Sequence, residues 1–304
     1  MRGELASQVI TADPRSEPRA MKPCMWTSIY VELSPEDAIR RLADIGWECF
    51  ELSCEHIGVI ATDGDRLGRA RRVRAVADEL GVRLAQVHLL ITADVASADA
   101  ETRNRDMGAL QREIECCGEM GIPLGVLHPG GRGTALTRAD EGTLTRNRVA
   151  GFTQVAAWVV AAHMRIAVEN MADRLGSGTG RRREFGGTIA ELHELIDAVG
   201  WPGLGICLDT SHANVQGLDL PAAIAEAGER LIALHVSDND GSGDQHRTPY
   251  NGKMDWVKIV AALRGIGYDA PFNLEIPGER GCPLDVVDAK MRAALETVKW
   301  LVTQ

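Results

Sequence analysis

The chain lacks most features of secreted, membrane-bound or nucleic-acid-binding proteins. No apolar run approaches the ~20 residues that a membrane-spanning helix needs. The first twenty residues carry Glu4, Asp13 and Glu17 and have no apolar core of the kind found in secretory signals. Aromatic residues make up only 4% of the 304 residues, and the formal charge is −10. That charge disfavours nonspecific attraction to nucleic acid, which usually requires a basic face.

Patterns typical of disulfide frameworks and of dinucleotide binding are also missing. The seven cysteines form no C-x-x-C pair, and several lie in apolar segments. They therefore predict reduced thiols in the core of a cytoplasmic protein. No G-x-G-x-x-G follows the first apolar run, which argues against an open dinucleotide-binding sheet.

What is present, from residue 24 onward, is an alternation of short apolar runs with longer amphipathic segments. Predicted strands cover the runs 25–31, 48–53, 84–90, 124–128, 165–170, 205–209, 231–236 and 271–276. Predicted helices follow them at 34–46, 64–81, 101–120, 144–162, 188–199, 220–228, 255–265 and 284–302. A helix after each apolar strand indicates βα units around a parallel sheet. Eight such units predict a TIM (β/α)8 barrel, with a doubly wound open sheet as the alternative.

The barrel is expected to fill residues 23–304 as a single domain, because no linker interrupts that range. Residues 1–22 are expected to be a disordered extension, or an overlong start with Met21 as the natural first residue.

Polar side chains fall at the ends of consecutive predicted strands, which converge on one mouth in a TIM barrel. These side chains, all able to bind a metal, are His88, His128, Glu169, Asp209 (with His212 three residues on), His235 and Glu275. A single buried histidine is more often structural than a ligand. Burying all of these groups together would be very costly without compensation, and a divalent cation satisfies them jointly. The set contains no thiolate, which suits Zn²⁺, Mn²⁺, Co²⁺ or Fe²⁺ and leaves the metal's identity open.

Five segments carry a resemblance to a known family: LHPGG at 127–131, AVENM at 167–171, CLDTSHA at 207–213, LHVSDNDGSGDQH at 234–246 and LEI at 274–276. With them, nearly all of residues 23–304 resembles the sugar phosphate isomerase/epimerase superfamily. This is the xylose-isomerase-like group of TIM barrels, which also includes the endonuclease IV type of DNA repair enzyme. Read without the resemblance, the polar loop after 231–236 fits a solvated loop of Asx turns equally well.

The resemblance implies two sets of site residues. The ketose epimerases of the group imply a metal site of Glu169, Asp209, His235 and Glu275, with Glu169 and Glu275 also serving as the acid/base pair. The endonuclease IV branch implies a second set of ligands, at His88, His128, His212, Asp244 and His246. In a sugar-active member, the four histidines of that second set would instead contact the substrate.

Two departures from the family pattern leave the substrate open. Leu175 stands where the ketose epimerases place a substrate-binding glutamate, and no strand end carries a lysine of the kind that xylose isomerases use. The arginines 181–183 follow the fifth predicted strand, so they could capture a substrate carboxylate or phosphate at the mouth. A solvated loop with its charges facing water is the simpler reading of that segment.

Together these observations predict a metal-dependent isomerase or epimerase that moves a proton next to a carbonyl of a small carbohydrate: a sugar, a sugar phosphate or an inosose. They do not separate isomerase from epimerase or dehydratase. The alternative is an endonuclease IV-like phosphodiesterase, which the negative charge and scarce aromatics disfavour. A non-catalytic ligand-binding barrel ranks third. No membrane partner is expected, and a homo-oligomer is left open.

Overall fold

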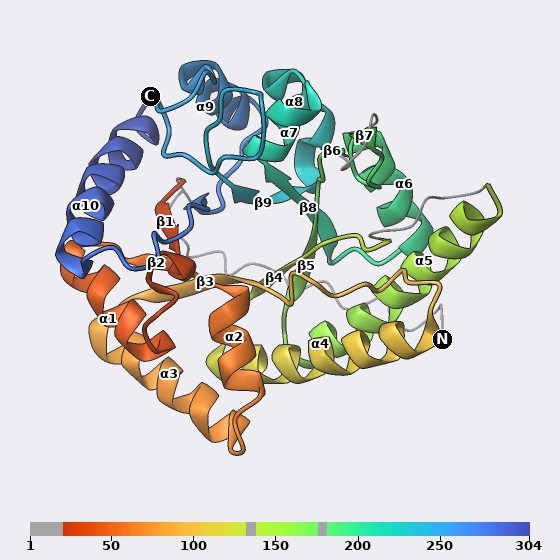
Figure 1. Ribbon diagram of the computed structural model, residues 1–304, viewed down its shortest axis with the longest axis horizontal. Coiled ribbons are helices and arrows are strands. Elements are labelled where there is room, and N and C mark those ends of the chain that lie inside the picture. The colour runs from red at the N-terminus through yellow and green to blue at the C-terminus, as the bar shows by residue number, and fades with distance from the viewer. Residues whose placement is uncertain (1–20, 132–137, 176–180) are drawn as a thin grey trace.

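Eight parallel strands form a nearly closed barrel surrounded by helices, so the TIM barrel prediction is confirmed (Figure 1). The computed structural model describes residues 21–131, 138–175 and 181–304. The barrel strands are β1 (Pro23–Trp26), β2 (Cys49–Leu52), β3 (Arg83–His88), β4 (Leu124–Leu127), β5 (Arg165–Glu169), β8 (Leu204–Asp209), β9 (Leu231–His235) and β10 (Phe272–Leu274). Their order around the barrel is β10-β1-β2-β3-β4-β5-β8-β9.

The surrounding helices begin and end at the signals that the sequence carries. They are α1 (Pro35–Ile45), α2 (Cys54–Ala61), α3 (Arg66–Leu80), α4 (Ala100–Met120), α5 (Arg138–Ala161), α6 (Ile189–Val199), α7 (Thr210–Gln216), α8 (Leu220–Ala227), α9 (Trp256–Gly265) and α10 (Leu284–Leu301). Ser34 caps α1 by accepting from the backbone N–H of Asp37, and Gly46 ends that helix at a φ of 110°. Within the described part of the chain, no helix is both long and apolar enough to cross a membrane.

The first and last strands in sequence, β1 and β10, lie side by side in the barrel. Strand β10 pairs with β1, with Pro23 opposite Phe272. On its other side β10 meets the chain just after β9, where Val236 donates to the carbonyl of Asn273 at 2.8 Å and Glu275 donates to that of Val236 at 3.0 Å. Strand β10 therefore holds both edges of the sheet together.

The structure corrects several predicted elements. The strand predicted at 25–31 ends at Trp26 and is followed by a 3-10 turn, Thr27–Tyr30. The chain leaves the ladder there because the Thr27 hydroxyl accepts the Ser53 N–H at 2.9 Å in place of a backbone carbonyl. The strands predicted at 84–90 and 271–276 are also shorter than expected, and the helix predicted at 144–162 begins earlier, at Arg138.

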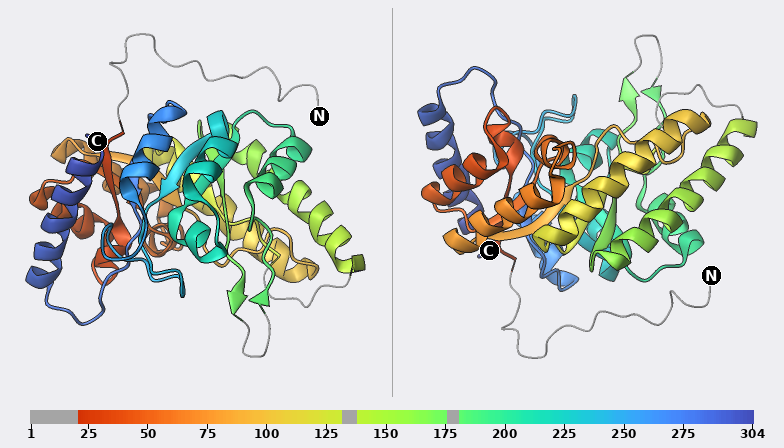
Figure 2. Two further views of the ribbon diagram at one scale, coloured as in Figure 1. Left: turned by 90° about the horizontal axis from the view of Figure 1, so that it is seen from above. Right: turned by 90° about the horizontal axis from the view of Figure 1, so that it is seen from below.

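Short elements that follow the strands were not predicted. Helices α2 and α7 begin directly after β2 and β8, and both are capped by a residue at the strand end: Ser53 accepts from His56 N–H, and Asp209 accepts from His212 N–H. The loop after β5 contains a two-stranded antiparallel hairpin of β6 (Arg174–Leu175) and β7 (Arg181–Arg182), which projects beyond one end of the barrel (Figure 2). Residues 1–20 of the predicted extension lie outside the described residues.

The apolar core has two parts. The larger part lies between the strands and the helices and includes Trp47, Phe50 and Trp256. The inside of the barrel is lined by smaller side chains in two clusters: Leu124, Val126, Ala167, Cys207 and Ala233, and Cys24, Cys49 and Ala85. The seven cysteines, all within the described residues, are free thiols.

Helix α4 carries a buried acid that should make stability depend on pH. Glu113 is 3% exposed, accepts the Leu90 N–H at 2.8 Å, and burial raises its pKa from 4.5 to about 7. Between these two values the folded state binds more protons than the unfolded state, so stability falls as pH rises through this window. We expect Glu113→Gln to be more stable than the parent chain above pH 7, by on the order of 3 kcal/mol, and equal to it below pH 4.5.

Urea unfolding at both pH values measures this difference. Glu79→Gln, on an exposed position of α3, is the matched control and should change stability at neither pH. A stability difference that is the same at both pH values would assign the effect to packing and not to the charge of Glu113.

Candidate metal centre

The predicted strand-end residues all lie at one end of the barrel. Four are the last residues of their strands (β3, β5, β8 and β9), and two directly follow β4 and β10. In chain order they are His88, His128, Glu169, Asp209, His235 and Glu275, with exposed fractions between 0% and 4%. The carboxyl ends of all parallel strands lie at the same end of a TIM barrel. Residues that are far apart in the sequence therefore meet at this end.

Four of these side chains converge on one point. Glu169, Asp209, His235 and Glu275 each contribute one ligand atom, and these four atoms lie within 4.8 Å of one another. Glu169 Oε2 and Glu275 Oε2 each lie 3.3 Å from Nδ1 of His235. The structure thus brings together the four residues that the family resemblance implies as metal ligands.

One buried atom of each of these side chains has no hydrogen-bond partner among the described residues: Glu169 Oε2, Asp209 Oδ2, His235 Nδ1 and Glu275 Oε2. Leaving such atoms unpaired costs roughly 1–3 kcal/mol each, and more for charged groups. The other oxygen of Asp209 is held in place, because it accepts the His212 N–H at 2.6 Å. A divalent cation would satisfy all four atoms at once, and three carboxylates with one imidazole are suitable ligands for it.

Hydrogen bonds on the far side of two histidine rings determine which nitrogen faces the centre. His88 donates from Nδ1 to the Leu89 carbonyl at 2.8 Å, and His235 donates from Nε2 to the Glu51 carboxylate at 3.0 Å. A neutral ring then turns its unprotonated nitrogen toward a carboxylate, as Nε2 of His88 does toward Glu169 at 3.3 Å. Two electron-rich atoms at this distance repel each other unless a proton or a cation lies between them.

Glu169 is the common member of several contacts. Besides His235, its Oε2 lies 3.3 Å from Nε2 of His88 and 3.2 Å from Nε2 of His128. Its Oε1 lies 3.3 Å from Nδ1 of His212. His88, Glu169 and His235 form a further group that could hold a metal.

The remaining predicted residues form a group beside Glu169. Asp244 Oδ2 lies 3.4 Å from Nε2 of His212 and 3.0 Å from Nε2 of His246. The Ser211 hydroxyl donates to the other oxygen of Asp244 at 2.6 Å. The predicted second set therefore lies around Glu169 in two parts: His88, His128 and His212 contact Glu169 directly, and Asp244 joins His212 to His246.

The electrostatics of the cluster favour the charged forms of Glu169 and His235 but the neutral form of Glu275. Burial opposes ionisation of Glu169, but His235 and His128 outweigh it and hold the pKa of Glu169 well below its usual range. Burial likewise opposes protonation of His235, yet Cys207 and the carboxyl groups around it raise the pKa of His235 well above its usual value. Burial raises the pKa of Glu275 to about 8, against the opposing effect of His235. The two glutamates thus differ strongly in their tendency to hold a proton.

The loop after β9 positions Asp244 and His246 through a structural carboxylate. Asp238 accepts from the N–H groups of Tyr250 and Gly252, at 3.0 and 3.1 Å. A Cβ at position 252 would lie 2.1 Å from an Asp238 oxygen, so only glycine fits there. His246 has a φ of 45°, unusual for a non-glycine residue, and its Nδ1 donates to the Glu275 carbonyl at 2.8 Å. Asp238 is therefore a turn residue, whereas Asp244 and His246 face the cluster.

The family model for xylose isomerase-like TIM barrels matches residues 39–304. The chain belongs to this family. The resemblance predicted from the five sequence segments is thereby confirmed.

The chain is similar both to proteins named as endonucleases and to the structure of a sugar epimerase. An uncharacterised protein of Sinorhizobium fredii, y4fM, is 26% identical over 179 residues, which are 59% of this chain and 55% of that protein, so the chain spans little more than half of this relative's length. A probable endonuclease 4 of Nitratidesulfovibrio vulgaris is 35% identical over 224 residues, 65% of this chain and 72% of that protein. The solved structure of a D-psicose 3-epimerase in the presence of D-fructose has a TM-score of 0.76 at 19% identity and covers 93% of this chain and 100% of its own. That likeness shows the fold.

Some residues of the site were missed in the sequence. Glu51, at the third position of β2, is fully buried and accepts from both His235 and the Asn273 amide. Asn170, directly after β5, accepts the Asp209 N–H at 2.6 Å and donates to the Asp209 carbonyl at 3.1 Å. The sequence signal for both was a polar residue in or directly after an apolar run: Glu51 within β2 and Asn170 after β5.

Of the arginine segment 181–183 and Leu175, the structure describes the side chain of Arg183. Arg183 forms an ion pair with Glu191 of α6. Its guanidinium is therefore not free to capture a substrate carboxylate or phosphate, as the sequence had suggested. The side chains of Leu175, Arg181 and Arg182 lie outside what the structure describes.

We expect Glu51→Gln to weaken metal binding by about 10–100-fold, the usual effect of removing a carboxylate behind a histidine ligand. The lost charge lowers the basicity of His235 and loosens the hold on its Nε2. Competition with a chelator measures the affinity, and Glu48→Gln, exposed just before β2, is the control. Parent-like affinity in Glu51→Gln would show that His235 needs no such support.

Proposed function

We propose that the chain is a metal-dependent isomerase or epimerase that moves a proton at a carbon next to a carbonyl of a sugar, a sugar phosphate or an inosose. The observation that carries this proposal is the pair of buried carboxylates, Glu169 and Glu275, which flank His235 at 3.3 Å each from non-adjacent strands. Environments that push the pKa values of two such groups apart mark an acid/base pair.

The four converging residues, Glu169, Asp209, His235 and Glu275, would hold the metal. When bound, a divalent cation would supply Lewis-acid polarisation of neighbouring substrate oxygens. Glu169, kept ionised, is suited to remove the proton from carbon, and Glu275 is suited to carry one to the opposite face. The ring nitrogens of His212 and His246, and of His88 and His128, are suited to hold substrate hydroxyls.

The second candidate is an endonuclease IV-like phosphodiesterase. It is favoured by the two further groups of potential ligands, His88 with His128 around Glu169, and His212 with Asp244 and His246, because phosphodiester hydrolysis uses two or three metals. The probable endonuclease 4 relative supports the same candidate. The net charge of −10 weighs against a nucleic-acid substrate.

A substrate panel separates the two candidates. Ketoses, sugar phosphates and inososes are incubated with metal-loaded protein in deuterated water, and exchange of C–H protons is followed by NMR. We expect exchange at one carbon of at least one compound. Metal-dependent cleavage of an abasic DNA duplex, with no exchange on any panel compound, would overturn the proposal in favour of the phosphodiesterase.

We also propose that residues 23–304 act as one domain in the cytoplasm. The continuous barrel and the seven free thiols support this.

A further inference from the structure

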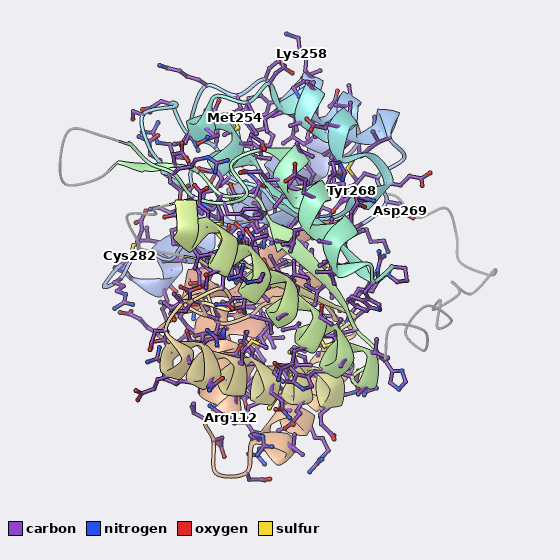
Figure 3. All side chains as sticks on the ribbon, turned by 90° about the vertical axis from the view of Figure 1, so that its right-hand side faces the viewer. Arg112, Met254, Lys258, Tyr268, Asp269 and Cys282 are labelled. Atoms are coloured by element: carbon purple, nitrogen blue, oxygen red, sulfur yellow. The ribbon has the colours of Figure 1, made fainter. Side chains whose placement is uncertain are left out.

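A large cavity lies at the amino-terminal end of the barrel, opposite the metal cluster. Its volume is about 510 Å³. It is lined by the first residues of several strands, among them Arg83, Leu124, Arg165 and Leu231, and by Tyr268 of the loop before β10. In Figure 3, Tyr268 and Asp269 of this cavity lie on the right-hand side of the molecule, across from Cys282 of the loop after β10.

The cavity exists because the lower half of the barrel interior is thinly filled. TIM barrel interiors are usually packed with layers of bulky branched side chains. Here Ala85 lines the cavity and packs with Cys24 and Cys49, while Ala167 and Ala233 occupy the next level. Small side chains at these levels leave room for a small molecule, since pockets of ~300–1,000 Å³ are typical of ligand sites.

Two arginines line this cavity. Arg83 begins β3 and Arg165 begins β5, on either side of Leu124 at the start of β4. On β5 the side chains of Arg165, Ala167 and Glu169 share one face by strand periodicity, and Arg165 lies on that face at the end opposite Glu169, where it is exposed to solvent as Arg83 is.

Neither guanidinium is paired. Arg83 and Arg165 make no side-chain hydrogen bond or ion pair with any residue that the structure describes, whereas Arg41, Arg66 and Arg230 each bind a carboxylate at 3.1 Å or less. Partial burial lowers the pKa of Arg165. Two exposed guanidinium groups at the opening of one cavity, with their donors unused, are suited to bind an oxyanion.

Acidic residues restrict what could bind. Glu229 and Asp269 also line the cavity, close to the starts of β9 and β10, and β10 lies across the barrel from β4. A ligand with negative charge at both ends would be repelled there. The cavity wall also includes Ile232 and Ile266, which suit an uncharged or apolar remainder.

We propose that this cavity binds a small molecule with an oxyanion at one end, a carboxylate or a phosphate, held jointly by Arg83 and Arg165. Leu124 and the apolar wall hold the remainder of the ligand. This site is separate from the metal centre and does not depend on the reaction proposed for it.

Calorimetric titration of metal-loaded full-length protein tests the proposal. The probes are inorganic phosphate, glycerol 3-phosphate and butyrate, and their relative affinities distinguish a phosphate ligand from a carboxylate ligand. We expect saturable binding of at least one probe. Arg83→Gln and Arg165→Gln should each weaken it by about 10-fold, and the double variant should abolish it. Arg112→Gln, at an exposed position of α4, should leave it unchanged.

A further variant separates the two ends of the barrel. Glu169→Gln, altered at the metal centre, should retain the part of probe binding that the double arginine variant loses. Absence of saturable binding for all three probes would overturn the proposal. So would parent-like binding by the double arginine variant, or binding that is lost in Glu169→Gln instead. Melting temperatures of the variants confirm that a loss of binding does not reflect unfolding.

Discussion

Replacing Glu169 with glutamine is expected to remove the bound divalent metal and to lower turnover by about three orders of magnitude or more. Glu169 Oε2 lies 3.2–3.3 Å from nitrogens of His88, His128 and His235, so one carboxylate serves several potential ligand groups. An amide in its place is neutral and binds a divalent cation weakly. Elemental analysis of protein purified without chelator, together with the turnover assay, measures both effects.

Asp209→Asn should behave in the same way, because Asp209 Oδ2 is another of the unpaired atoms that point into the group. Glu194→Gln, exposed on α6, removes one negative charge without touching the site and should retain full metal content. Full occupancy in both Glu169→Gln and Asp209→Asn would contradict the assignment of this cluster as the metal centre.

Replacing Glu275 with glutamine is expected to slow exchange of the substrate C–H proton with solvent deuterium by about 100-fold or more. Glu275 and Glu169 each approach Nδ1 of His235 to 3.3 Å from non-adjacent strands, so Glu275 is the second carboxylate placed to transfer a proton. Its amide can still contact a substrate oxygen but cannot transfer a proton. NMR at saturating metal, with exchange normalised to bound metal, separates this effect from weakened metal binding.

The control for this variant is Glu226→Gln, at an exposed position of α8. If metal-loaded Glu275→Gln exchanges the proton at the parent rate, Glu275 is not an acid/base group. The assignment of the metal ligands would be unaffected by that result. A substrate that is converted without any exchange in the parent chain would point to a different reaction at the same cluster.

The residues at the mouth could be predicted because parallel strands impose a simple rule. Each strand of a TIM barrel ends at the same edge, so a polar residue that closes an apolar run is placed without knowledge of packing. His88, Glu169, Asp209 and His235 follow this rule, and sequence spacing located them correctly. The second set could be named from the sequence, but the contacts of Asp244 with His212 and His246 depend on the conformation of the loop after β9.

Other features depend on contacts that no local pattern encodes. Glu51 meets His235 across 184 positions of sequence, and only the closed barrel brings them together. The end of β1 depends on Thr27 bonding to the backbone of Ser53 in the next unit. The amino-terminal cavity depends on which small side chains face each other inside the barrel, and Arg83 and Arg165 look like ordinary strand-flanking charges in the sequence.

Strand β10 is the last barrel strand to be synthesised, and this order determines when the four-residue cluster can form. Strand β10 supplies the partner of β1 and joins the chain after β9, and Glu275 follows it directly. A nascent chain that has not yet released this strand from the ribosome carries at most three members of the four-residue cluster and two open sheet edges. Such edges are templates for aggregation. A chain can therefore assemble the full four-residue cluster only after β10 and Glu275 have been synthesised, and a product truncated before β10 would keep both sheet edges open.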